Sequence, residues 1–332
     1  MADYVDNMTK TGTLSTGATT AFEQLAYFAL RSQPMLEMVC DVKSTNQTHQ
    51  GASVQFTIYD DLNRAITPLT EGEEITPVAL SDSNKTVTLA EYGNAVVTSA
   101  KLRGQSFMNV DADAANIVGY NMANSMDQIV HDLLVGGTNV AYGGNATSKT
   151  TIDAADNLDA ADVRKQVAAL RSASVATFTG GSYLGMIHPD VSYDLRDDTA
   201  VTDIIQFQIR QDSAAIRAGS IGTFGGVEFI ETSRLGLGID DTAETWANAS
   251  DGAGAAGTVD VYPTMIVGKQ GMAKAHSRAA GFGENPSIVN GPVTDILRRF
   301  QPVGWYHLVG YNRFREAALR HIETSSSIGA NA

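Results

Sequence analysis

The feature that most constrains the fold is one long amphipathic segment, residues 111–135, which reads DADAANIVGYNMANSMDQIVHDLLV. Its apolar side chains recur every three or four residues, as on one face of an α-helix: Val118, Met122, Met126, Ile129 and Leu133. Asp111 and Asp113 bring negative charge to the first turn. Gly136 and Gly137 follow the last turn, where a left-handed glycine usually ends a helix. Such a helix spans roughly 37 Å. Taken alone, the pattern is that of a core helix packed on a sheet.

Length, charge and cysteine content limit the number of domains and the kinds of partner that this chain can have. The chain has 332 residues, 43% of them hydrophobic, which is enough for two compact domains or one domain with large excursions. The formal net charge of −14 repels phosphate backbones and disfavours nucleic-acid binding by the whole protein. The single cysteine, Cys40, excludes an internal disulfide. We expect neither a signal peptide in residues 1–20, which predict a flexible arm, nor a membrane span.

A long polar stretch lies between two predicted strands. Residues 53–59 (SVQFTIY) alternate as a strand does, and residues 85–102 predict a returning strand. The stretch between them, residues 60–84, contains two prolines and three closely spaced acids: Pro68, Pro77, Glu71, Glu73 and Glu74. Compact domains seldom carry so long a loop without a function for it. It is either a mobile surface loop or an arm that is buried on another subunit.

The middle of the chain predicts a mixed region of short helices and strands. Two helices are expected, one at 22–30 and one that begins after the capping residue Asp159, and a helical turn is expected at 190–198 with Tyr193 and Leu195 facing inward. The expected strands are at 183–187 and 259–268, with a hairpin at 221–232 around Gly225-Gly226. Residues 204–216 are ambiguous. Pro263 suggests an edge or a bulge, because proline cannot donate to a sheet ladder.

The C-terminal part predicts a long strand at residues 302–314. Its large residues share one face (Val303, Trp305, His307, Val309 and Tyr311), and two glycines, Gly304 and Gly310, lie on the other. This contrast suggests a strand lying close over a helix. A basic island surrounds it on an otherwise acidic chain, with arginines at 298, 299, 313, 315 and 320. The island is a solvated face, a phosphate contact or a set of partners for acids on another subunit.

We favour the last of these three possibilities, because dense charge in a chain of opposite sign most often pairs with that charge. The candidate inter-subunit contacts are Glu71, Glu73, Glu74, Arg298, Arg299, Arg313 and Arg315.

No catalytic or ligand-binding pattern is found in the sequence. The six histidines lack metal-ligand spacing, and HExxH, CxxC, P-loop and dinucleotide signatures are all missing. Cys40 has no neighbouring group in the sequence to activate it. We therefore expect no enzyme activity, no cofactor and no metal.

Four phrases and the order of the predicted parts resemble one known family. The phrases are IHPDVSYDLRDD at 187–198, SIGTFGGVEFIET at 220–232, VYPTMIVGKQGMAKA at 261–275 and FQPVGWYHLVGYNRFREAALRHIETSSS at 300–327. They are similar to tailed-bacteriophage major capsid proteins with the Hong Kong 97 fold, in the branch named for podophage N-four. The resemblance covers nearly the whole chain.

The resemblance implies an α+β capsid fold with five parts: an N-terminal arm (1–50), an E-loop hairpin with its base (51–104), a spine helix with P-domain (105–157), an A-domain (158–265) and a return to the P-domain sheet (266–332). It implies self-assembly into hexamers and pentamers of an icosahedral shell that encloses double-stranded DNA. It also implies a location in the virion capsid after assembly in the bacterial cytoplasm, with separate scaffolding, portal and decoration proteins and no membrane. Crosslinking through Lys85 is not expected.

Two other classes remain open at this stage. The first is a soluble α/β binding or enzyme domain in which residues 60–84 form a lid. The second is a phage tail or decoration protein.

Overall fold

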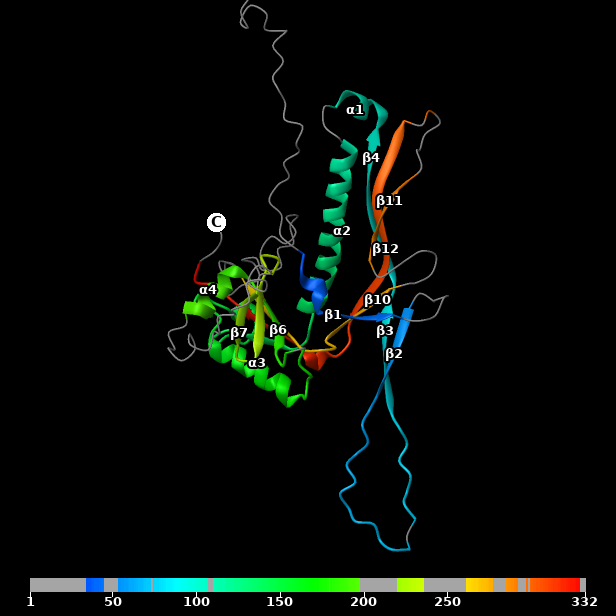
Figure 1. The fold of residues 1–332 in the computed structure, drawn as a ribbon. Coiled ribbons are helices and arrows are strands. Elements are labelled where there is room, and N and C mark those ends of the chain that lie inside the picture. The colour runs from blue at the N-terminus through cyan, green and yellow to red at the C-terminus, as the bar shows by residue number, and fades with distance from the viewer. Residues whose placement is uncertain are drawn as a thin grey trace, which may run out of the picture.

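A computed structural model describes residues 34–44, 53–72, 74–106, 110–178, 180–197, 220–235, 261–276, 285–291, 297 and 299–328 (Figure 1). The expected arm at 1–20, the expected helix at 22–30 and the ambiguous stretch at 204–216 lie outside these residues. The described chain forms two sheets, a long helix beside one of them, and a two-stranded hairpin that extends away from both (Figure 1).

The first sheet has five strands arranged around the long C-terminal strand β12 (Phe300–Arg313). On one side, β4 (Ala90–Ser99) pairs with most of its length. On the other side, β10 (Met272–His276) and β11 (Ser287–Asn290) pair with different parts of it. The strand β1 (Cys40–Ser44), which the sequence did not predict, joins β10 in parallel.

The predicted long helix is confirmed as α2 (Val110–Val135). It lies along β12 (Figure 1). Three contacts mark its course: Trp305 Nε1 donates to Asn121 Oδ1 at 2.9 Å, Tyr311 lies against Met126, and Arg313 Nη1 donates to the Leu133 carbonyl at 3.1 Å. The large residues of β12 therefore face the helix. The expected apolar stripe packs against the core: Val118 and Met126 are buried, and Met122, Ile129 and Leu133 are partly buried against the same cluster. Three further buried apolar residues of the helix were not in the stripe: Ala114, Val130 and Leu134.

The glycines that follow α2 and those within β12 have different roles from the ones that the sequence predicted. Gly136 and Gly137 do follow the helix, but neither has a positive φ. A Cβ at Gly136 would lie 2.9 Å from Arg313 Nη1, so this glycine leaves room for the arginine. Gly304 lies opposite Ala95 of the neighbouring strand β4, and a Cβ at Gly304 would lie 2.7 Å from the Ala95 Cβ, so this glycine allows close strand pairing rather than close approach of the helix.

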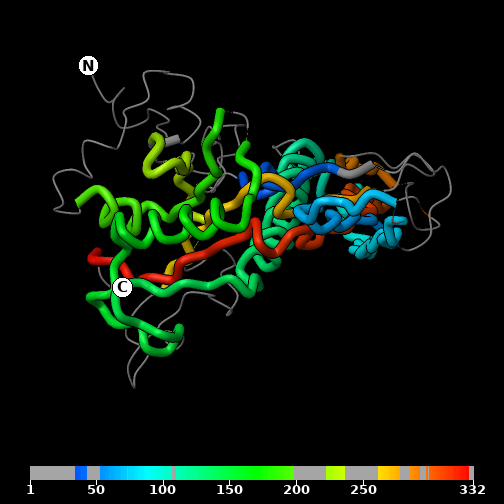
Figure 2. Tube along the Cα trace, turned by 90° about the horizontal axis from the view of Figure 1, so that it is seen from below, coloured from blue at the N-terminus to red at the C-terminus, as the bar shows by residue number. Residues whose placement is uncertain are grey.

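The second sheet has six strands in the order β5-β13-β9-β6-β8-β7. In chain order they are β5 (Val140–Tyr142), β6 (Tyr183–Ile187), β7 (Ser220–Phe224), β8 (Val227–Glu231), β9 (Tyr262–Val267) and β13 (Leu319–Thr324). Helices α3 (Ala160–Ser172) and α4 (Pro189–Asp197) contribute to one buried cluster with this sheet, whereas α2 contributes to another. Figure 2 shows the green trace of α3 and α4 beside the red trace of β13, with the teal trace of α2 on the other side of the molecule.

Most local predictions in this sheet are confirmed. Asp159 caps α3 by accepting the Asp162 N–H at 2.7 Å, and Gly225 and Gly226 turn the β7–β8 hairpin with φ values of 60° and 92°. Tyr193 is 54% exposed, so its inward placement was wrong. The strand β9 lies inside the sheet rather than at an edge, but β6 pairs only with its Met265–Val267 end, which leaves Pro263 paired on one side.

The stretch at 53–102 forms two separate units. Strands β2 (Ser53–Tyr59) and β3 (Asp82–Thr88) form the two-stranded hairpin. Its base packs on the first sheet, because Val54 and Val87 form one buried cluster with Ala273 and Ala275. The single returning strand expected at 85–102 was wrong, because the chain leaves the hairpin at Leu89, enters the first sheet as β4 and ends in helix α1 (Ala100–Gln105). Three short 3₁₀ turns complete the described fold: η1 (Leu36–Val39), η2 (Lys149–Thr151) and η5 (Glu316–Ala318).

Candidate functional site

The excursion between β2 and β3 is the most unusual surface of the protein. Figure 1 shows that it extends far from both sheets. Its apolar side chains are exposed: Leu62 55%, Ile66 85%, Leu69 73%, Ile75 62%, Val78 73% and Leu80 72%. An exposed set of large apolar residues on one segment marks an interaction site. Because the excursion points away from the body, it does not cover the rest of the chain as a lid would.

Two of the three predicted acidic residues lie at the turn of this excursion. Glu71 and Glu74 are exposed on either side of a turn in which Gly72 has a φ of 87°. Glu73 lies outside the described residues. The turn therefore places negative charge on the excursion, which extends away from both sheets (Figure 1).

The basic island does not stay together in three dimensions. Arg299 precedes β12 and lies with its guanidinium carbon 5.4 Å from the centre of the Phe300 ring, whereas Arg313 ends the same strand. Fourteen residues of strand separate the two by about 46 Å. Arg320 belongs to the other sheet, in β13. Arg298 lies outside the described residues.

Arg313 already has partners within the chain. Its Nε lies 3.1 Å from Glu316 Oε2, and its Nη1 bonds the Leu133 carbonyl at the C-terminal end of α2, where a cation is favoured by the helix dipole. Arg299 and Arg315 are exposed. Among the described arginines of the predicted set, these two are the better placed for contact with another molecule.

A buried ion pair that the sequence analysis missed connects α2 to the segment after β8. The Arg234 guanidinium donates to the Asp127 carboxylate, and side chains of both are almost fully buried, at 1% and 2% exposure. Asp127 also accepts the Leu36 N–H at 2.6 Å. One carboxylate on α2 therefore holds the start of η1 and the segment after β8. In the sequence, Asp127 falls among the apolar positions of α2. This position was the signal that could have predicted a buried, paired carboxylate.

A second polar group fixes η1 to the first sheet. Glu37 Oε1 accepts hydrogen bonds from Lys274 Nζ at 2.5 Å and from Tyr311 at 2.7 Å. Burial by itself raises the pKa of Glu37, but these two bonds hold it below its usual value. Burial and the Lys274 charge lower the pKa of the nearby His307 to about 4. Burial also raises the pKa of the Cys40 thiol to about 12, so the thiol stays protonated.

Among the residues that the structure describes, no group of three or more His, Cys, Asp or Glu side chains could hold a metal ion. No helix in the described part of the chain is long and apolar enough to cross a membrane.

Several solved phage capsid structures are similar to this fold. The capsid of Ralstonia phage GP4 is similar with a TM-score of 0.69 and 15% identity, over 93% of this chain and 95% of that chain. The cyanophage Pam1 capsid asymmetric unit has a TM-score of 0.73 and 14% identity, over 98% and 100%. The acid-stable capsid of Helicobacter pylori bacteriophage KHP30 has a TM-score of 0.67 and 11% identity, over 98% and 100%.

These likenesses confirm the expected α+β fold of the Hong Kong 97 type, in which a long helix crosses a sheet and a hairpin extends from it. No curated protein matches the sequence. A family model described as phage capsid protein matches residues 10–328. Since that match spans nearly the whole sequence, the chain belongs to the phage capsid protein family.

Proposed function

We propose that the chain assembles into hexamers and pentamers of an icosahedral shell that encloses double-stranded DNA, as the major capsid protein of a virion. The observation that carries this proposal is the excursion between β2 and β3, whose six large apolar residues are exposed on a single subunit. Each such side chain gains about 1.5–3 kcal/mol when it is fully buried. The excursion therefore favours contact with a neighbouring copy.

The charge of the chain suits this role. At a formal net charge of −14, the subunit repels the phosphate backbone of DNA. A shell with this charge encloses DNA without binding it tightly or by sequence. Assembly then depends on contacts between copies, repeated around each ring.

We assign the parts of the chain as the resemblance suggests. Residues 1–50 are the N-terminal arm, 51–104 the E-loop and its base, 105–157 the spine helix with P-domain, 158–265 the A-domain, and 266–332 the return to the P-domain sheet. The hairpin β2–β3 and the helix α2 support the second and third assignments. Scaffolding, portal and decoration proteins are separate partners, and assembly takes place in the host cytoplasm.

Acidic residues on the excursion are proposed to pair with arginines of a neighbouring subunit. Glu71 and Glu74, with Glu73 between them, are exposed where the excursion turns. Arg299 and Arg315 are exposed partners at the two ends of β12, whereas Arg313 is paired internally with Glu316. A double variant, Glu71→Lys with Glu74→Lys, is expected to weaken assembly. The control, Asp61→Lys with Asp82→Lys, changes the charge equally, and equal defects in both would contradict the pairing.

Mass measurement and electron microscopy test the main proposal. A capsid subunit of 35.2 kDa is expected to form rings of five and six copies and closed particles. A soluble enzyme with a lid would remain a monomer or dimer. A tail or decoration protein would form trimers or tubes. Light scattering of the purified full chain, followed by negative-stain images, separates these outcomes.

A further inference from the structure

The outer face of α3 carries a basic groove at its junction with the β7–β8 turn. The groove has a volume of about 390 Å³ and is lined by Arg164, Val167, Ala168, Arg171 and Gly225. The turn is shaped to receive one of these arginines, because a Cβ at Gly226 would lie 2.7 Å from Arg171 Nη2. Arg164 lies over Phe224, at 5.7 Å from the ring centre. Two guanidinium groups and an apolar floor thus lie together on an acidic protein.

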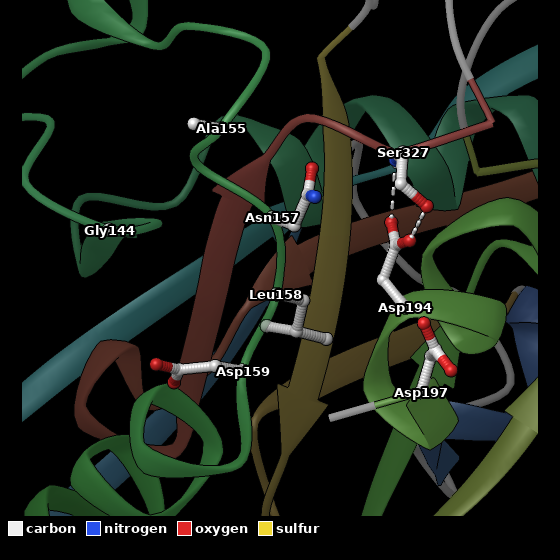
Figure 3. Close-up of a pocket in the computed structure, with 8 residues that line it drawn as sticks. All are labelled: Gly144, Ala155, Asn157, Leu158, Asp159, Asp194, Asp197 and Ser327. Carbon is white, nitrogen blue, oxygen red and sulfur yellow. Dashed lines mark hydrogen bonds between the residues drawn. The ribbon is translucent and has the colours of Figure 1, made fainter. Parts of the chain in front are cut away.

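An acidic pocket of about 330 Å³ lies near the other end of α3. Figure 3 shows Leu158 between Asp159 on one side and Asp194 and Asp197 on the other. Two of the three carboxylates have structural partners: Asp159 caps α3, and Asp194 accepts the Ser327 N–H at 3.0 Å and the Ser327 hydroxyl. Asp197 is exposed and has no ion pair among the described residues.

The two surfaces lie toward opposite edges of the six-stranded sheet. The acidic pocket includes Gly144, which follows the edge strand β5, whereas Gly225 joins β8 to the opposite edge strand β7. Along α3, Asp159 and Arg171 are separated by about 18 Å. The basic groove and the acidic pocket therefore do not meet within one chain. They can meet when two copies are arranged head to tail.

We propose that the basic groove receives the acidic pocket of the next copy in the ring, with Arg171 of one subunit facing Asp197 of its neighbour. This inference rests on the proposed function, since it describes a contact inside the capsid ring. A ring needs a heterologous interface, in which two different surfaces of the same protein meet. The planar guanidinium of arginine matches a carboxylate with two parallel hydrogen bonds. Copies that carry a charge of −14 also need local opposite charge to approach one another.

Charge exchange between the two positions tests this contact. Arg171→Glu and Asp197→Arg are each expected to raise the subunit concentration needed for assembly at least about tenfold, because like charges then face one another. The double variant Arg171→Glu/Asp197→Arg restores the opposite charges and is expected to assemble within about threefold of the unaltered chain. Lys269→Glu is the matched control, because it reverses an exposed charge that lines neither surface.

Mixing the two single variants gives a second readout. Alternation of the two variants puts opposite charges at every interface of a six-membered ring, but a five-membered ring keeps one mismatch. Native mass spectrometry is therefore expected to show hexamers with few pentamers. A variant that fails to fold by circular dichroism is replaced by Arg171→Gln or Asp197→Asn, each with a smaller expected defect of about threefold.

The outcomes separate this contact from the proposed function. Unaltered chain that forms no ring or shell would overturn both. Normal shells from the unaltered chain and from Arg171→Glu would overturn the contact alone. Defects that add in the double variant, instead of cancelling, would also overturn it.

Discussion

The Arg234 guanidinium and the Asp127 carboxylate form a buried ion pair between the segment after β8 and the middle of α2. Removal of one partner leaves the other charge buried without compensation. Arg234→Leu is therefore expected to lower the free energy of unfolding by about 3–5 kcal/mol. Chemical denaturation of unassembled subunits measures this loss. The double variant Arg234→Leu/Asp127→Leu is expected to recover part of it, and a larger loss in the double variant would argue against the pair.

Close pairing of β12 with β4 makes Gly304 intolerant of a side chain. A Cβ there would lie 2.7 Å from the Ala95 Cβ and 2.8 Å from the Asn94 carbonyl oxygen. Gly304→Ala is expected to destabilise the subunit by about 1–3 kcal/mol through overpacking. Gly104→Ala is the control, because no atom lies within 4 Å of its Cβ position in α1. Thermal unfolding that ranks the two variants equally would contradict this packing.

Acid is expected to weaken the first sheet through His307. Burial and the Lys274 charge lower its folded pKa from 6.5 to about 4. Between these two pH values the unfolded chain binds a proton that the folded chain does not, so stability falls as pH drops from about 6.5 to 4. The loss is on the order of 3 kcal/mol. His307→Gln is expected to show a flatter pH dependence of the unfolding free energy, and an unchanged slope would exclude this histidine as the source.

Exposed apolar residues of the excursion are expected to matter for assembly and not for folding. Ile66 is 85% exposed, so Ile66→Ser should change the unfolding free energy of the isolated subunit by no more than about 0.5 kcal/mol. Its shell yield should fall sharply, because the lost contact is repeated in every copy. Asn63→Ser is the neighbouring control. Equal shell yields from both variants, measured by sedimentation, would remove Ile66 from the interface.

Local patterns predicted elements whose causes are local. The Asp159 cap started α3 where expected, and the Gly225-Gly226 pair turned the hairpin. The apolar period of α2 predicted the helix and its packing face but not the depth of burial, because Met122 and Val130 both join the core and only contact with the rest of the fold buries Val130 more fully. Tyr193 suited a buried position by composition, yet it is exposed because no element packs over that side of α4 in the described chain.

The sequence by itself determined the long helix, the long alternating strand, the protruding segment at 60–84 and the acidic character, since each depends on neighbouring residues or on total charge. The tertiary structure decided which distant residues contact one another and which are separated. It divided the arginines between two ends of β12, buried Asp127 against Arg234, and placed a basic groove and an acidic pocket toward opposite edges of one sheet. These relations involve residues far apart in the chain. Only the folded packing of strands and helices decides which of these residues meet and which are held apart.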